Sequence, residues 1–428
     1  MSAAPITRGA YSLLGTLLTP ALQLWLKRRS RRGKEDADRL PERFGHSRLP
    51  RPSGMLVWLH AASVGEAQSV LTLVRALLEA HADIHLLVTT GTVTSATLVA
   101  QQQLPRVIHQ YVPVDTPAAV RRFLSHWQPD LALWVESEFW PQLLWQAQAQ
   151  HIPMLLINAR ISQRTYEGWL KWPRTIHSLL HAFCSIYAGS SEDAARLAAL
   201  GGTDIQDVGN LKYDAAPLPV SPTLLQQLSS ASAGRPIFLA ASTHANEEQL
   251  VAEAHAVIAQ QLPDLLTIIV PRHAARGDSI AADLKARSIA LAQRSRNEPI
   301  LPTTSIYLAD TMGELGTFYQ LAQVVFMGGS LIAHGGQNPL EAARFANALI
   351  TGPHTHNFTA IIARFTAADA IRIAADKTQL AQQVLELLTH PQERDMLASR
   401  ASEVVAQARG ASNRILQQCS ALLTRAAT

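Results

Sequence analysis

From residue 55 onward, short apolar runs alternate with longer segments in which apolar residues recur at helical spacing. This alternation predicts parallel sheets whose strands are joined by helical crossovers. The strands predicted in the first half are Leu56–Leu59, Ile84–Thr89, Leu131–Val135, Met154–Ile157, Ile186–Ala188 and Ile205–Val208. Those predicted in the second half are Ile237–Ala240, Leu265–Val270, Ile289–Ala292, Ser305–Leu308, Val324–Met327 and Ala348–Ile350.

A stretch rich in proline, serine and alanine interrupts this alternation between residues 217 and 236, and its composition is typical of a linker. At 428 residues, of which 47% are hydrophobic, the chain is too long for one ordinary core. We therefore predict an α/β protein with two Rossmann-like, doubly wound parallel-sheet domains facing a cleft, where such folds bind ligands. The predicted parts are an N-terminal anchor and basic segment (1–34), a first domain (35–216), the linker (217–236), a second domain (237–376) and C-terminal helices that pack back on the first domain (377–428).

The N-terminal segment combines an apolar run, Tyr11 to Leu26, with a cluster of positive charge directly after it. The basic residues are Lys27, Arg28, Arg29, Arg31, Arg32 and Lys34. A spanning helix needs roughly 20 apolar residues, whereas this run is shorter and contains Pro20 and Gln23. It predicts an interfacial helix or a short anchor at an anionic cytoplasmic leaflet. The alternative is an amphipathic core helix followed by a solvated basic loop.

The first predicted strand runs into H-A-A-S-V-G-E, which places His60, Ser63, Gly65 and Glu66 near its carboxyl end. A carboxylate at a helix start, beside a glycine, is a candidate general base for an acceptor hydroxyl. Its alternative role is a favourable charge at the helix N-terminus.

A second pair of acids, Glu136 and Glu138, follows the strand Leu131–Val135. The flanking aromatic residues favour a half-buried position, where a carboxyl group has a raised pKa unless it is paired. Arg160 and Lys212 each follow a later strand. They are candidate partners for these acids or for an anionic substrate, although a lone basic residue is more often a surface charge.

In the second half, a glycine-rich segment from Gly328 to Glu341 leaves a strand and opens a helix from about Asn338. Such a turn predicts backbone N–H groups exposed at the positive end of a helix dipole, as a cradle for an anion. It is neither a P-loop nor a G-x-G-x-x-G fingerprint. Further polar groups of this segment are Ser330, His334, Gly335, Gly336 and Gln337.

Other strand ends of the second half add Ser242, Arg272 and His273. A guanidinium there can grip a phosphate, and Glu341 can accept ribose hydroxyls. With Gly313 and Asn338, these residues predict a nucleotide pocket. Cys184 and Cys419 are far apart, which fits a reducing compartment, and no spacing indicates a metal site.

Together these motifs resemble the 3-deoxy-D-manno-octulosonic acid (Kdo) transferases, glycosyltransferases of lipopolysaccharide biosynthesis. The motifs that carry the resemblance are L-H-A-A-S-V-G-E (59–66), E-S-E-F-W-P (136–141), N-A-R-I-S (158–162), G-N-L-K-Y-D (209–214), A-S-T-H (241–244), V-P-R-H (270–273), D-T-M-G-E-L (310–315), G-G-S-L (328–331), H-G-G-Q-N-P-L-E (334–341) and G-P-H-T-H-N-F (352–358). They span nearly the whole chain. The sequence has E-S-E where E-T-E is expected, and His356 where a larger residue is frequent, so substrate preference can differ.

The resemblance implies a GT-B fold, CMP-Kdo as the donor and the lipid A precursor as the acceptor at the inner membrane. It implies no cofactor, no metal, no nucleic acid and no obligate protein partner. Glu66 matches the family's general base, while Glu136 and Lys212 match positions that stabilise the transition state. The CMP site is matched by Pro271, Arg272, Met312, Gly313, Glu314, Asn338, Pro339, Leu340 and Glu341.

Two other classes of function are compatible with the motifs taken singly. A sugar-nucleotide epimerase or hydrolase on the same fold would use Glu66 with His60 and release a product without a lipid. A membrane-docked nucleotide-binding protein would bind CMP without turnover. The acids at the strand ends favour an enzyme.

Overall fold

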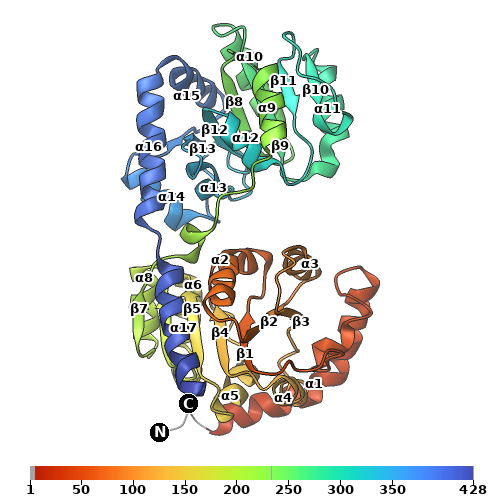
Figure 1. The fold of residues 1–428 in the computed structure, drawn as a ribbon, viewed down its shortest axis with the longest axis vertical. Helices are drawn as coiled ribbons and strands as arrows, with labels where there is room; N and C mark the ends of the chain where they lie inside the picture. Colours follow the sequence, from red (N-terminus) through yellow and green to blue (C-terminus); the bar gives the residue numbers. More distant parts are fainter. Residues whose placement is uncertain (1–4, 233, 428) are drawn as a thin grey trace. The chain divides into compact units, whose positions relative to one another are not determined.

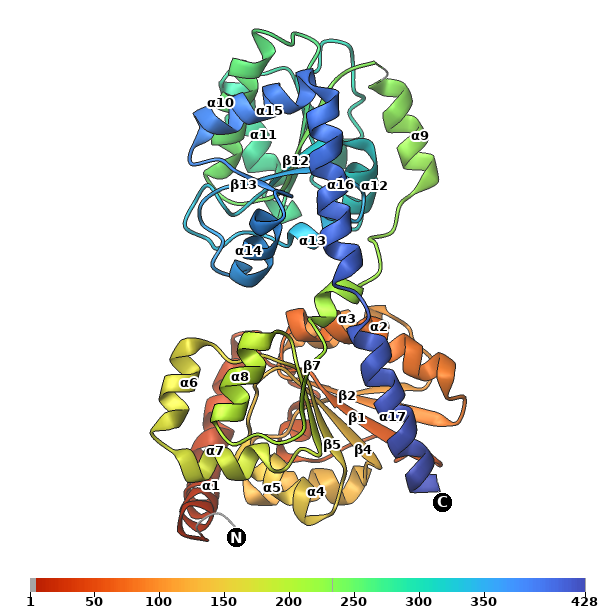
Figure 2. The same ribbon diagram turned by 90° about the vertical axis from the view of Figure 1, so that its left-hand side faces the viewer.

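The computed structural model describes residues 5–232 and 234–427, and residues 1–4 of the predicted N-terminal segment lie outside them. The chain forms two compact units. Unit 1 contains residues 1–215 and 408–428, and unit 2 contains residues 216–407. Figures 1 and 2 show the elements of both units.

Unit 1 is built on a seven-stranded sheet in the order β3-β2-β1-β4-β5-β6-β7, with every neighbouring pair parallel. Its strands are β1 (Met55–His60), β2 (Ile84–Thr90), β3 (Val107–Tyr111), β4 (Leu131–Val135), β5 (Met154–Ala159), β6 (Ser185–Ala188) and β7 (Ile205–Asp207). This is a doubly wound arrangement, and its strand order reverses between β1 and β4, where such sheets bind ligands.

Helices cover both faces of this sheet because successive strand residues point to opposite sides. The helices are α1 (Pro5–Arg31), α2 (Val64–Ala80), α3 (Val93–Gln101), α4 (Pro117–Trp127), α5 (Pro141–Ala149), α6 (Gln163–Leu170), α7 (Pro173–Leu180), α8 (Ser191–Ala199) and α17 (Ala411–Ala427), with short 3₁₀ turns η1 (Leu40–Phe44) and η2 (Leu211–Asp214). Leu56 and Trp58 of β1 pack in one core with α4, α5 and α7. Val57 and Leu59 pack in the other core with α2, α3 and α17. Figure 2 shows α17 beside this sheet.

Helix α1 lies against α4, with Leu26 fully buried. Part of the basic cluster is already paired, since Arg29 Nε lies 2.8 Å from Glu35 Oε1. Among residues 5–232 and 234–427, no helix has the length and apolarity needed to cross a membrane.

Unit 2 contains a second seven-stranded parallel sheet in the order β10-β11-β9-β8-β12-β13-β14. Its strands are β8 (Ile237–Thr243), β9 (Leu266–Pro271), β10 (Leu291–Gln293), β11 (Ile306–Leu308), β12 (Val324–Met327), β13 (Ala348–Thr351) and β14 (Arg372–Ile373). Its helices are α9 (Pro222–Ala231), α10 (Glu247–Ala259), α11 (Gly277–Ala286), α12 (Leu315–Leu321), α13 (Pro339–Ala343), α14 (Thr359–Ala367), α15 (Lys377–Thr389) and α16 (Pro391–Gln407), with 3₁₀ turns η3 (Ala274–Arg276) and η4 (Arg294–Arg296). Helices α10, α11 and α15 share one buried core with the sheet.

Two segments differ from the sequence-based interpretation. The supposed linker contains α9, capped by Ser221 and packed on α12. Pro222, in the first turn of α9, starts a helix instead of preventing one. The C-terminal helices also divide, because α15 and α16 belong to unit 2 and α17 belongs to unit 1.

Candidate active site

The carboxyl end of β1 leads directly into α2, and this turn positions Glu66. Ser63 is the N-cap of α2 and accepts a hydrogen bond from Glu66 N. In return, Ser63 Oγ donates to Glu66 Oε1 at 2.8 Å, and Ala62 N donates to Glu66 Oε2 at 2.8 Å. The S-x-x-E spacing thus forms a variant of the capping box. It holds the Glu66 side chain in one orientation, with Gly65 exposed beside it.

The protonation equilibrium of Glu66 is shifted toward neutral pH. Burial raises its pKa to about 7, and the charges of Glu136 and Glu138 act in the same direction. Hydrogen bonds from Ser63 and Ala62 oppose the shift. A carboxyl group with a pKa near the working pH is well suited to general-base catalysis. Glu66 thus combines a raised pKa with a place at a helix N-terminus.

The two acids after β4 lie near Glu66 because β1 and β4 are neighbours in the sheet. Glu136 adopts a left-handed conformation with φ 59°, which is uncommon for a residue with a side chain and recurs at functional sites. Burial raises the pKa of Glu138, and the charge of Glu136 raises it further. Lys212 Nζ lies 3.9 Å from Glu136 Oε1.

Lys212 is held in place through the backbone around it. Asn158 Oδ1, at the end of β5, accepts from Leu211 N at 3.0 Å, and Asn210 Oδ1 accepts from Lys212 N at 2.9 Å. These bonds fix η2 against the sheet. Arg160 is exposed after β5, and within the described part of the chain it makes no ion pair. Unit 1 thus brings together Glu66, Glu136, Glu138 and Lys212.

In unit 2, three amides of the glycine-rich segment after β12 already have an internal partner. The N–H groups of Gly329, Ser330 and Leu331 all donate to the carboxylate of Glu247, at 2.6, 3.0 and 3.0 Å. Ser330 is itself fully buried, and its hydroxyl donates to Met327 O and accepts from Gly352 N. An internal carboxylate therefore binds these three amides.

His244 gathers several of the predicted polar groups of unit 2. Its ring stacks on that of His334, with centroids 3.6 Å apart, and His273 lies edge-on at 5.9 Å. Gln337 Nε2 lies 2.8 Å from His244 Nε2. Burial, followed by the charges of its neighbours, lowers the pKa of His244 to about 4. The neutral ring therefore accepts the hydrogen bond from the Gln337 amide.

The residues matched to the CMP site lie at the carboxyl ends of several strands of unit 2. Arg272 follows β9 and is exposed, and Met312 is 71% exposed. Glu314 is already paired, because Arg294 donates to its two carboxylate oxygens at 2.8 and 3.1 Å. These bonds hold the pKa of Glu314 below its ordinary value. Met312 and Gly313 lie in the same loop.

The short helix α13 carries the other matched residues. Asn338 caps it by accepting from Leu340 N, and Asn338 Nδ2 lies 3.4 Å from Glu341 Oε1. Burial raises the pKa of Glu341, whereas Asn338, Arg344 and Arg272 lower it. Glu341 and Arg272 therefore lie close enough to interact, as a shared site requires. Pro339 and Leu340 are buried, while Gly335 and Gly336 adopt positive φ angles.

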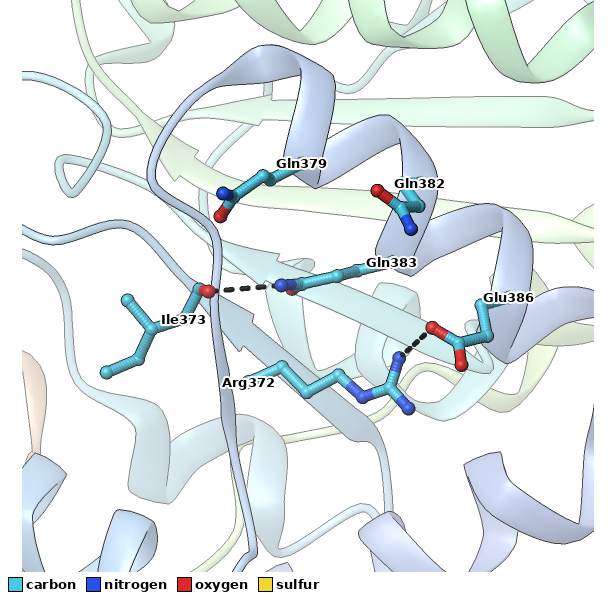
Figure 3. A pocket seen from close by; sticks show the side chains of 6 residues that line it. All are labelled: Arg372, Ile373, Gln379, Gln382, Gln383 and Glu386. Carbon is cyan, nitrogen blue, oxygen red and sulfur yellow. Dashed lines mark hydrogen bonds and ion pairs between the residues drawn. The ribbon is translucent and has the colours of Figure 1, made fainter.

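A depression of about 410 Å³ also lies at the β14 edge of unit 2 (Figure 3). Its polar groups largely bond to one another: Arg372 pairs with Glu386 at 2.8 Å, and Gln383 donates to Ile373 O at 3.0 Å. It contains none of the predicted site residues. We assign it no role.

Sequence reasoning missed Glu247 and Arg294. Glu247 stands in the first turn of α10, where an acid is expected from the helix dipole alone. Only the tertiary approach of the β12 turn shows its second role. Arg294 follows the short strand β10 without a recognisable motif.

Two parallel-sheet α/β units are the architecture of the GT-B class. A structure of UDP-GlcNAc 2-epimerase from Neisseria meningitidis bound to UDP-GlcNAc matches 85% of this chain and 99% of its own, with a TM-score of 0.57 and 13% identity. At that identity the likeness establishes the fold alone.

The sequence comparisons define the family more closely. Residues 38–215 match the family model described as 3-deoxy-D-manno-octulosonic-acid transferase (kdotransferase). The chain is 32% identical to the 3-deoxy-D-manno-octulosonic acid transferase of Haemophilus influenzae, over 97% of this chain and 98% of that protein. It is 35% identical to the Bordetella pertussis protein of the same name, over 96% and 98% of the two chains. The chain therefore belongs to the Kdo transferase family of glycosyltransferases.

Proposed function

We propose that the protein transfers Kdo from CMP-Kdo to the lipid A precursor (lipid IVA), with inversion at the anomeric carbon and Glu66 as the general base. The observation that carries this proposal is the Glu66 carboxyl group. It is fixed by Ser63 and Ala62, and its pKa lies near 7. The donor and acceptor identities come from the family to which the chain belongs.

In the proposed reaction, Glu66 removes the proton from a sugar hydroxyl of the lipid. The oxygen attacks the anomeric carbon of Kdo, and CMP leaves from the opposite face with the electron pair of the broken bond. The transition state has oxocarbenium character. Glu136 and Lys212, 3.9 Å apart, supply fixed charges of both signs, which stabilise developing charge without rearranging.

The donor is assigned to unit 2. Arg272 would bind the CMP phosphate, since a guanidinium provides several N–H donors in a fixed geometry. Glu341 and Asn338 would accept ribose hydroxyls and position the nucleoside. Phosphate charge is thereby met by side chains, and the mechanism assigns no step to a metal or another cofactor.

We place the enzyme at the cytoplasmic face of the bacterial inner membrane, where its lipid substrate would lie. Helix α1 supports this location as an interfacial element. Leu13, Leu17 and Trp25 are 61%, 66% and 51% exposed, and basic residues occupy the last turn of the helix. Exposed leucines next to cationic residues are typical of a helix that lies on an anionic bilayer.

The decisive experiment incubates the purified full-length protein with CMP-Kdo and lipid IVA and measures product mass. Wild-type protein should add Kdo, whereas Glu66→Ala should be slower by about 10²- to 10⁴-fold with CMP binding retained. Glu79→Ala provides a matched control, because Glu79 is an exposed acid on the same helix. It should transfer at the wild-type rate.

Other outcomes would redirect the assignment. Wild-type-like transfer by Glu66→Ala would exclude Glu66 as the base. Release of free Kdo without a lipid product would favour a hydrolase. CMP binding without turnover of any sugar would favour a binding protein.

A further inference from the structure

Glu247 occupies an unusual position for an acid in the first turn of a helix. Its side chain is 0% exposed, and its two oxygens receive four backbone N–H groups. Oε1 accepts from Ser330 and Leu331 at 3.0 Å each. Oε2 accepts from Gly329 at 2.6 Å and from His244 at 3.2 Å.

These four bonds favour the ionised form of Glu247. Every partner is a donor, so a proton on either oxygen would face an N–H group and remove an acceptor. On balance burial raises the pKa of Glu247, although the four N–H groups act to lower it. Hydrogen bonds to an ionised acceptor are stronger than those to a neutral one, and they offset the cost of burying the charge. A role limited to the α10 dipole would not require bonds to a turn more than 80 residues away.

The carboxylate joins two turns that already approach closely. Ser242, at φ 57°, lies at the end of β8, and the β12 turn begins at Gly328. A Cβ atom added at Gly328 would lie 2.6 Å from Ser242 O, closer than real Cβ contacts allow. Any side chain at position 328 would push the two turns apart. The bonds of Glu247 to both turns hold them together.

The two turns carry residues to which we assigned the binding of CMP-Kdo in unit 2. His244, donor of one of the four N–H groups, stacks on His334 and accepts from Gln337. Arg272 N donates to Thr243 O at 2.9 Å. Arg272, the residue assigned to the CMP phosphate, is thus tied to the turn that Glu247 fixes.

We propose that Glu247 is a positioning residue for the donor. Its buried carboxylate replaces an external anion in the glycine-rich cradle and sets the relative position of the β8 and β12 turns, so that Arg272 and the His244 cluster are ordered before the nucleotide binds. This inference rests on the proposed binding of CMP-Kdo by unit 2. Glu247 itself does not touch the substrate.

The test titrates CMP into full-length Glu247→Gln by calorimetry and measures the steady-state constants for transfer. The glutamine side chain has the same size as glutamate. It offers only one acceptor oxygen, and its NH₂ group would face N–H groups that bond to the carboxylate in the wild type. Losing charge-assisted bonds in this way should weaken CMP binding about 10- to 100-fold. The KM for CMP-Kdo should rise in parallel while the KM for the lipid acceptor stays unchanged.

A matched control separates positioning from general stability. Asp115 in unit 1 also binds two backbone amides, Leu143 N at 2.9 Å and Gln142 N at 3.0 Å. Asp115→Asn should lower the melting temperature and leave CMP binding at the wild-type level. Glu247→Asp keeps the charge on a shorter side chain and should restore part of the affinity. It also provides a variant if Glu247→Gln does not fold.

Hydrogen exchange gives a readout that is independent of activity. The amides of Gly329, Ser330 and Leu331 should lose protection in Glu247→Gln while the core strands keep theirs. Wild-type CMP affinity in a folded Glu247→Gln would overturn the positioning role and leave the proposed function intact. Failure of the wild-type protein to bind CMP would instead refute the assignment of the donor to unit 2.

Discussion

The acids at the strand ends of the two units differ in the groups that bond to them. In unit 1, Glu66 and Glu138 have raised pKa values, from burial and from the nearby charge of Glu136. In unit 2, Arg294 binds Glu314 and lowers its pKa. Burial raises the pKa of Glu247 on balance, although four backbone N–H groups bond to its carboxylate. The acids of unit 1 therefore lie beside other carboxyl groups, while Glu314 and Glu247 of unit 2 are bonded by a guanidinium and by backbone amides.

The difference corresponds to two chemical tasks. A general base must change its protonation state at working pH, so its environment must leave the two states close in free energy. A binding surface for an anionic nucleotide must keep its shape, which carboxylates that accept several hydrogen bonds from fixed donors help to maintain. The three predictions below test this contrast in order of decreasing effect.

The largest effect is expected from removing the charge at Lys212. Lys212→Met keeps the length of the side chain but removes the cation 3.9 Å from Glu136. Loss of a group that stabilises developing charge should reduce kcat by about 10²- to 10³-fold, with CMP affinity unchanged. Lys171→Met, at an exposed lysine of the same unit, is the control. A reduced CMP affinity with normal kcat would contradict a catalytic role for Lys212.

A smaller effect should appear in the pH dependence of kcat/KM, which should rise through about pH 7 as Glu66 loses its proton. Ser63→Ala removes a bond that lowers the pKa of Glu66, so the inflection should move to higher pH. Glu138→Gln removes a charge that raises this pKa, so the inflection should move to lower pH. Ser63→Ala should also destabilise the protein by about 1 kcal/mol through loss of the α2 cap.

These opposite shifts are measured in parallel pH profiles of the two variants and the wild type. A flat wild-type profile from about pH 5 to 9, or shifts of both variants in the same direction, would exclude Glu66 as the titrating base.

The smallest effect is expected in unit 2 from Arg294→Gln. The Arg294 and Glu314 side chains are 24% and 23% exposed, and such partly exposed ion pairs contribute less than about 1 kcal/mol. CMP affinity should fall by less than about fivefold, as measured by calorimetry. A much larger loss would show that the Met312–Glu314 loop depends on this single pair, which would weaken the contrast between the units.

Most of the fold was predictable from the sequence because the buried strands read as continuous apolar runs. The bounds of β4 and β12 were predicted as observed. The strands that were missed, β3 and β14, lie at sheet edges. β3 is only partly buried along most of its length, and β14 has two residues, so neither leaves a hydrophobic signal.

The site was predictable where a residue's place depends on its own strand end, as for Glu66 and Glu136. It was not predictable where the partner is distant in sequence. The glycine-rich segment was predicted to offer amides to an anion, and the partner of its first amides is Glu247, which precedes them by more than 80 residues. Only the folded structure shows whether an internal carboxylate or an external ligand binds these amides.

The division of the chain has a consequence for biosynthesis. Ile415, Cys419 and Leu423 of α17 belong to the core of unit 1, yet the ribosome makes them after all of unit 2. At about 5–20 residues per second, unit 1 waits on the order of 10–40 s for its last helix. During that interval, the face of β1 and β4 that α17 covers is exposed to chaperones or to aggregation. A chain truncated after unit 2 would contain all of unit 2, but its unit 1 would lack α17.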